Sequence, residues 1–127
     1  MITSTNLPEN FMATFTDGMH EALVDTPVSY GSKFAGFTPP SLLEASLATC
    51  INLIVRVAAE NHGIPLAGIK VQVSLNTANK DETVFEYSMA LEGELTDDQR
   101  IILRHAANGC PVKKILSGAV SFKDKSE

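Results

Sequence analysis

The longest apolar stretch of the chain, residues 38–63, restricts the fold more than any other part of the sequence. It reads TPPSLLEASLATCINLIVRVAAENHG. Pro40 suits the first turn of a helix, where a missing backbone N–H costs no hydrogen bond, and Gly63 suits the left-handed residue that ends one. The stretch therefore predicts a helix of about six turns. It is so apolar that other parts of the fold must cover most of its sides.

Three residues inside this helix, Glu44, Asn52 and Arg56, argue against a membrane span, because charges at bilayer depth are costly. We therefore expect a buried core helix and no membrane partner. The polar side chains of the helix gather on one stripe of a helical wheel: Ser41, Glu44, Thr49, Asn52, Arg56 and Glu60.

Cys50, one of only two cysteines, lies near the midpoint of the helix and nearly opposite the polar stripe. A cysteine on an apolar face is usually a small, inert core residue, so spacing alone favours a structural role. Its neighbours on the wheel are Leu43, Ser46, Leu47, Leu53, Ile54 and Val57.

The net charge and the cysteine content limit the partners and the cellular compartment that we expect. The net charge is −5, and no basic cluster exceeds the Lys113–Lys114 pair, which argues against a nucleic-acid partner. The first residues lack the pattern of a signal peptide, so we expect no secretory signal, and two cysteines without one fit a reducing cytoplasm. At 127 residues, we expect a single domain over 1–127.

Before the helix, an alternating apolar pattern and a Thr-Asp-Gly turn predict a hairpin. Residues 1–9 are expected to be a polar lead-in. The loop that follows the hairpin contains Tyr30, Lys33 and Phe34, which suit a pocket wall, although loops of this kind also often serve only as connectors. The predicted segments are a strand over 10–15, a turn over 16–18, a strand over 19–24 and a loop over 25–37.

After the helix, residues 69–75 and 85–91 alternate between apolar and polar side chains, which predicts an antiparallel pair of strands. Thr96 and Gln99 form a capping-box pattern that begins a second helix. Its expected inner face consists of Ile101, Ile102, His105 and Ala106.

The chain is predicted to end in a strand over 119–123, with Val120 and Phe122 pointing inward. The order of elements has two strands, a helix, two strands, two helices and a strand, without repeated βαβ units. That order indicates an α+β fold with a mainly antiparallel sheet.

Cys110 precedes Pro111 at the start of a short helical turn that extends through Leu116, which places it at the N-cap. The positive end of a helix lowers a thiol pKa, and Lys113 and Lys114 add positive charge. A cap residue that happens to be cysteine explains the pattern equally well. Sixty positions separate Cys50 and Cys110, so the two thiols can meet only through the fold.

No motif for a cofactor accompanies the cysteines. The histidines (His20, His62 and His105) have no ligand spacing, and the chain has no glycine-rich phosphate loop. We therefore expect neither a metal nor an organic cofactor.

Two segments resemble the family of osmotically inducible protein C and the organic hydroperoxide resistance proteins (OsmC/Ohr), nearest to its divergent OsmC-like branch. They are GFTPPSLLEASLATCINLIVRVAAENHGIPLAGIKVQVSL and GELTDDQRIILRHAANGCPVKKIL, within residues 36–120. The matching features are a Pro-initiated helix with Cys50 inside it, the GIPL join to the next strand, and GCPV with Cys110 after a capped helix. The resemblance implies an OsmC-like α+β fold around a long buried central helix, in an intertwined homodimer.

The resemblance also implies a thiol-dependent peroxidase of oxidative-stress defence that reduces organic hydroperoxides and often hydrogen peroxide. By resemblance, Cys50 is the peroxidatic cysteine, and its sulfenic acid condenses with Cys110. A thiol reductant, lipoyl-type or another dithiol, then reopens the disulfide. The apolar surroundings of Cys50 then suit a hydrophobic peroxide.

The chain departs from the family pattern at the groups that hold the thiolate, an arginine from the N-terminal strands and a glutamate ten residues before the cysteine. No arginine precedes Arg56, and Pro40 stands ten residues before Cys50. Glu44 lies about 120° from Cys50 around the helix and is a poor substitute for the missing glutamate. Lys33, or Arg56 from either subunit, is left to stabilise the Cys50 thiolate.

These departures keep a second function open: a noncatalytic OsmC-like protein that binds a small hydrophobic ligand at the dimer interface. The missing arginine and glutamate favour this alternative, whereas the two retained cysteine contexts favour the peroxidase.

Overall fold

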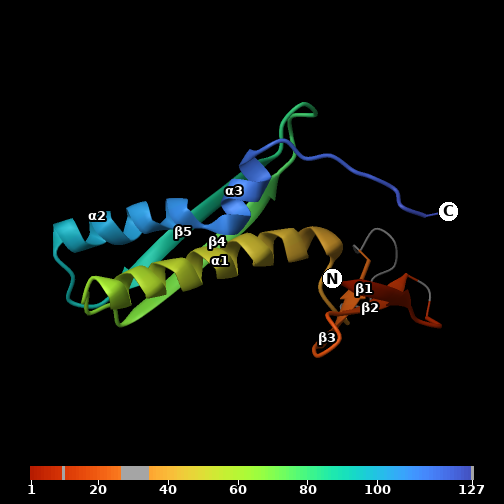
Figure 1. The fold of residues 1–127 in the computed structure, drawn as a ribbon, viewed down its shortest axis with the longest axis horizontal. Coiled ribbons are helices and arrows are strands. Elements are labelled where there is room, and N and C mark those ends of the chain that lie inside the picture. The colour runs from red at the N-terminus through yellow and green to blue at the C-terminus, as the bar shows by residue number, and fades with distance from the viewer. Residues whose placement is uncertain (10, 27–34, 127) are drawn as a thin grey trace. The chain divides into compact units, whose positions relative to one another are not determined.

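The computed structural model describes residues 1–9, 11–26 and 35–126 (Figure 1). The chain divides into two compact units, residues 1–43 and 44–127. The predicted loop residues Tyr30, Lys33 and Phe34 lie outside the described residues. The single domain predicted over 1–127 stays a prediction.

The N-terminal unit contains a three-stranded antiparallel sheet in the order β1-β2-β3. The turn between β2 and β3 is confirmed: Gly18 has φ +99°, and the Asp17 carboxylate accepts the His20 N–H at 2.7 Å. The predicted polar lead-in contains a strand that the sequence does not predict, because its four residues TSTN are polar and show no hydrophobic alternation. The strands are β1 (Thr3–Asn6), β2 (Met12–Thr16) and β3 (Glu21–Asp25).

The long helix α1 spans Pro39–Asn61, as the sequence predicts. Thr38 and Ser41 bond reciprocally at its start: each backbone N–H donates to the other side chain, at 2.9 and 3.3 Å. Gly63, with φ +61°, follows its end, and the Ile64 N–H donates to the Ala59 carbonyl at 2.9 Å. Both ends of α1 are therefore set by local chemistry.

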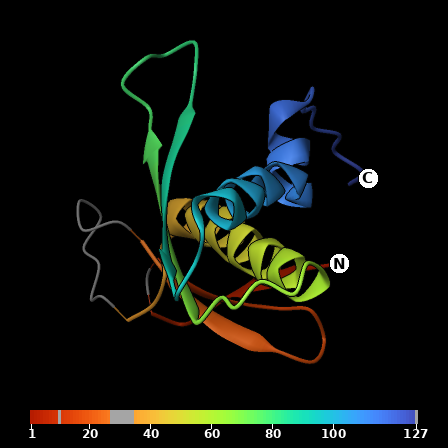
Figure 2. The ribbon, with the colours of Figure 1, turned by 90° about the vertical axis from the view of Figure 1, so that its left-hand side faces the viewer.

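The C-terminal unit contains an antiparallel hairpin, and α1 and α2 lie on the same side of it (Figures 1 and 2). The capping box at Thr96 and Gln99 is confirmed, with both reciprocal hydrogen bonds present. The elements are β4 (Gly68–Asn76), β5 (Val84–Glu92), α2 (Asp97–Ala106), the 3₁₀ turn η2 (Ala107–Gly109) and α3 (Pro111–Ser117).

The core lies between the helices and the hairpin. Paired strand residues such as Val71 and Met89 face it together and are half-buried. Its fully buried side chains are Ile51, Val55, Leu103 and Cys110.

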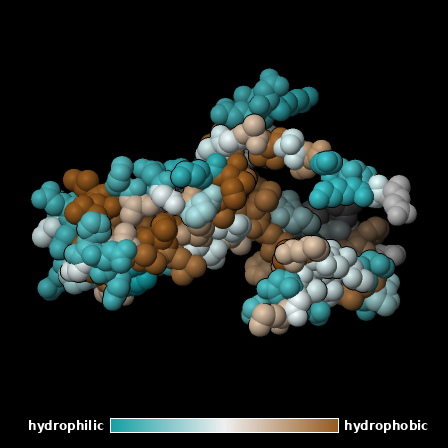
Figure 3. Space-filling model, viewed as in Figure 1, coloured by the Kyte–Doolittle hydropathy of each residue, from teal (hydrophilic) through white to brown (hydrophobic). Residues whose placement is uncertain are grey.

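Within this single chain, α1 buries one apolar face and exposes another. Leu47, Ile51, Val55 and Ala59 are buried, whereas Leu53 and Val57 are 66% and 52% exposed. Figure 3 shows hydrophobic surface over the region that α1 occupies in Figure 1. By length and composition alone, α1 is the one helix among the described residues that is able to cross a bilayer, which is weak evidence because core helices of soluble proteins share both properties.

Two details of the expected packing are wrong. The buried position of α2 is Leu103, and Ala107 of η2, four residues further on, is also buried. Ile101 is 65% exposed because it lies about 200° from Leu103 around the helix. Ile102 and His105 are also exposed, and Ala106 is half-buried. Residues 119–123 form no strand: among the described residues none pairs with them, and Phe122 is 96% exposed.

Candidate functional site

Cys110 is the N-cap of α3, with Pro111 at the first helical position, as the sequence predicts. Its Sγ accepts the Lys113 backbone N–H at 3.4 Å. The side chain is 0% exposed and belongs to the core between α1, α2 and the hairpin. Cys110 is therefore a capping residue and a core residue at once.

Cys50 is half-buried on α1 and packs against the same core cluster that contains Cys110. The fold thus brings together two thiols that are sixty positions apart in the chain. Both are free thiols, so the structure represents the reduced protein.

The pKa of the Cys110 thiol is raised above its ordinary value of 9.0, first by burial and second by a side-chain hydrogen bond with Cys50. The Lys113 backbone N–H lowers this pKa, as expected of a helix start, but burial and the neighbouring thiol outweigh it. The expectation of a lowered Cys110 pKa is therefore wrong in its net direction. At neutral pH this thiol keeps its proton.

The Lys113 ammonium, which we expected to act on Cys110, binds neutral groups. Its Nζ donates to Asn108 Oδ1 at 2.9 Å and to the Tyr87 hydroxyl at 3.2 Å, and lies 5.2 Å from the centre of the Tyr87 ring. No cation is among the causes of the Cys110 pKa shift.

The polar stripe of α1 binds the backbone of the segment 66–75. Arg56 Nη1 donates to the Leu66 carbonyl at 2.7 Å, and Asn52 Nδ2 donates to the Ile69 carbonyl at 3.3 Å. A Glu44 oxygen accepts the Leu75 N–H at 3.1 Å. The sequence shows the stripe but not its partners, because backbone groups leave no signal in the pattern of side chains. Through these bonds Glu44 and Arg56 stabilise the packing of α1 against this segment.

A cavity of about 260 Å³ is lined by residues one helical turn from each cysteine. Leu47 is three residues before Cys50, and Lys113 is three residues after Cys110. Its lining comes from α1, from α3, and from β5 with the residue before it: Leu47, Thr83, Phe85, Tyr87, Lys113, Leu116 and Ser117.

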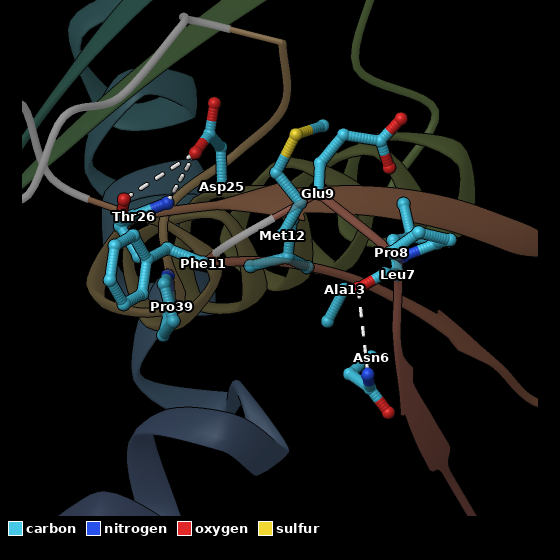
Figure 4. Close-up of a pocket in the computed structure, with 11 residues that line it drawn as sticks. Asn6, Leu7, Pro8, Glu9, Phe11, Met12, Ala13, Asp25, Thr26 and Pro39 are labelled. Atoms are coloured by element: carbon cyan, nitrogen blue, oxygen red, sulfur yellow. Dashed lines mark hydrogen bonds between the residues drawn. The ribbon is translucent and has the colours of Figure 1, made fainter.

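A larger cavity of about 480 Å³ lies in the N-terminal unit and contains neither cysteine (Figure 4). Asp25 at its wall is buried, and its carboxylate accepts the N–H groups of Thr26 at 2.7 Å and Ala35 at 3.3 Å. Asp25 thereby joins the two described ends of the loop before α1.

Known proteins resemble this chain in sequence pattern and in fold. A family model of OsmC-like proteins matches residues 30–124. The chain therefore belongs to the OsmC-like protein family, whose members are soluble proteins. None of the curated proteins matches the chain significantly.

Solved structures show the same α+β fold with antiparallel sheets. A Psychrobacter arcticus protein, named for osmotic stress induction and detoxification response, is 25% identical with a TM-score of 0.74, covering 90% of this chain and 85% of that one. The organic hydroperoxide resistance protein OsmC of Legionella pneumophila is 19% identical, with a TM-score of 0.67 and coverage of 93% and 88%. OhrB of Bacillus subtilis is 20% identical, with a TM-score of 0.64 and coverage of 93% and 91%.

Proposed function

We propose that this protein is a cytoplasmic, thiol-dependent peroxidase that reduces organic hydroperoxides. The observation that carries the proposal is the meeting of Cys50 and Cys110 in one core cluster, sixty positions apart in sequence. Family membership and the hydroperoxide-resistance names of two structural neighbours support the substrate class.

The division of roles follows from the two environments. Cys110 is fully buried, and its raised pKa keeps it protonated at neutral pH, which makes it a poor attacking nucleophile. Cys50 is half-buried and therefore accessible to a hydroperoxide. Cys50 is the attacking thiol and Cys110 the resolving one.

In the first step the Cys50 thiolate attacks the terminal peroxide oxygen, the O–O bond breaks, and the alkoxide leaves and takes up a proton as the alcohol. Cys50 is then a sulfenic acid. In the second step the Cys110 sulfur attacks the Cys50 sulfur and the S–O bond breaks. The hydroxide that leaves takes up the proton of the Cys110 thiol and becomes water. An external dithiol, lipoyl-type or another, returns both thiols with two electrons and two protons.

The protein is proposed to act as a homodimer. The exposed apolar residues Leu43, Leu53 and Val57 lie on one face of α1, and a second copy of the chain would remove them from water. The partner subunit then covers the apolar face of α1 that this chain leaves exposed.

The test follows both thiols during turnover with cumene hydroperoxide and a dithiol. We expect the wild-type protein to consume hydroperoxide and mass spectrometry to find a Cys50–Cys110 disulfide when the dithiol is withheld. Cys50→Ser is expected to abolish turnover. Cys110→Ser is expected to stop at a sulfenic acid that dimedone captures on Cys50. Turnover by Cys50→Ser equal to that of the wild type would end the proposal.

One observation favours the noncatalytic alternative, a protein that binds a small hydrophobic ligand at the dimer interface. Within the described residues, the guanidinium of Arg56 is bound to the Leu66 carbonyl and the ammonium of Lys113 to Tyr87 and Asn108. Both cations are thus held by groups other than Cys50. If Cys50 reacts with cumene hydroperoxide no faster than a free cysteine does, the alternative replaces the peroxidase.

A further inference from the structure

The cavity beside Lys113 has the chemistry of a ligand site, whichever function the thiols perform. Its apolar wall comes from three elements: Leu47 of α1, Phe85 of β5 and Leu116 of α3. We call this cavity, with the seven lining residues given above, the Lys113 pocket. It combines a hydrophobic wall with a cation, which is an amphipathic pattern.

Lys113 has no acidic partner in the described part of the chain. No described carboxylate lies within ion-pair distance of its ammonium, although the sequence has 15 acidic residues. Lys113 as a residue is half-buried, and its ammonium binds the neutral Asn108 oxygen and Tyr87 hydroxyl in exposed hydrogen bonds. An ammonium carries three N–H donors, so one donor is left for a further acceptor. A cation that is held only by neutral groups favours an anion at its remaining donor.

The volume limits the size of the occupant. About 260 Å³ is below the roughly 300–1,000 Å³ of sites for drug-sized molecules. The cavity therefore suits a ligand smaller than a drug-sized molecule, such as a short hydrocarbon chain with one headgroup.

We propose that the Lys113 pocket binds a small amphipathic carboxylate, with the carboxylate on Lys113 Nζ and the hydrocarbon chain against Leu47, Phe85 and Leu116. The carboxylate accepts the free N–H of the ammonium in a charge-assisted hydrogen bond. The chain removes the apolar wall from water. The ligand lies one helical turn from Cys50 and from Cys110, and it therefore shields Cys50 from reagents.

The test measures octanoate binding to the reduced protein by calorimetry at neutral pH. We expect one octanoate per chain, bound more tightly than octanol of the same length, and no binding of octylamine, which is a cation at this pH. Because these three probes share one hydrocarbon chain, they isolate the headgroup on the wild-type protein. Equal affinity for octanoate and octanol, or no octanoate binding at millimolar concentration, would overturn the proposal.

Matched variants locate the site. Lys113→Met is expected to weaken octanoate binding by about tenfold or more and to leave octanol binding unchanged. Lys113→Arg keeps the cation and is expected to retain octanoate. Lys114→Met removes an exposed lysine at the next position and is expected to have no effect. Octanoate affinity that is the same in Lys113→Met and in the wild type would refute the assignment.

The proposal is independent of peroxidase activity, and Cys50→Ser separates the two. This variant is expected to bind octanoate as the wild type does, even though it has no turnover. In the wild type, octanoate is expected to slow alkylation of Cys50 by iodoacetamide, and octylamine is not. Octanoate that leaves the alkylation rate unchanged would contradict the placement of the pocket beside the thiols.

Discussion

The two apolar faces of α1 have the same chemistry and different surroundings. Leu47, Ile51, Val55 and Ala59 are buried by the chain's own hairpin and helices, whereas Leu53 and Val57 are more than half exposed. Leu43, Cys50 and Val57 follow one another at intervals of seven residues, and Leu53 is three residues after Cys50, which is the spacing of a helix–helix seam. Hydropathy thus shows that a side chain requires cover, but not which chain supplies it.

Cys50 lies at the border between these faces. It is half-buried, packed against the core on one side and adjacent on the helical wheel to the exposed Leu43 and Val57 on the other. Cys110, by contrast, is entirely within the core. The comparison explains why two cysteines in one cluster are expected to differ in reactivity.

The largest effect is expected from truncation on the buried face. Ile51→Ala removes a fully buried side chain and leaves a cavity, so the free energy of unfolding should fall by about 2–5 kcal/mol in urea denaturation. Leu53→Ala, measured at a concentration where the protein is monomeric, should change it by no more than about 0.5 kcal/mol. Equal losses in the two variants would break the distinction between the faces.

The next effect concerns the association of two copies. Leu53→Glu combined with Val57→Glu places charges on the exposed face, and the dimer dissociation constant should rise by about a hundredfold or more. Light scattering over a dilution series measures this, with Lys114→Glu at an exposed position of α3 as the control. A wild-type protein that is monomeric at micromolar concentration would contradict the proposed homodimer.

A smaller effect is expected where α1 is tied to β4. Asn52→Ala leaves the Ile69 carbonyl without its donor and should cost about 1 kcal/mol of unfolding free energy. Thr49→Ala is the matched control, because the Thr49 hydroxyl is exposed and bonds only to carbonyls of its own helix. If both variants are as stable as the wild type, the side-chain bonds of the polar stripe contribute nothing measurable.

The smallest effect is the dependence of stability on pH through Cys110. Its pKa in the folded protein is raised above 9.0, so the folded state holds the proton more tightly than the unfolded chain. Its contribution is therefore constant below pH 9.0, and stability falls as the pH rises from 9.0 toward the folded pKa. Urea denaturation between pH 7 and pH 10 should show a shallower decline in Cys110→Ala. Parallel curves for the two proteins would show that the Cys110 pKa is not raised.

Features with local causes were predictable from the sequence. The start and end of α1, the capping box at Thr96 and the position of Cys110 at an N-cap each depend on residues within a few positions of one another. The hairpin of β4 and β5 was predictable because alternation over two neighbouring segments also fixes their pairing.

Features that depend on a distant partner were not predictable in the same way. The β1 strand consists of four polar residues and is recognised only by its pairing with β2. Residues 119–123 alternate like a strand, but a strand forms only by pairing, and no described residue pairs with them. In α2, Ile101 and Leu103 are equally apolar, and only the position of the core makes Leu103 the buried one.

The sequence by itself determined the family, the elements around α1 and the presence of two thiols in particular local settings. The tertiary structure decided that these thiols share one core, that burial raises the Cys110 pKa against the effect of its helix start, and that Lys113 faces neutral groups. The physical reason is that capping and turn formation act over a few residues. Burial, pKa and the partner of a charge depend instead on atoms that the fold brings together from distant positions.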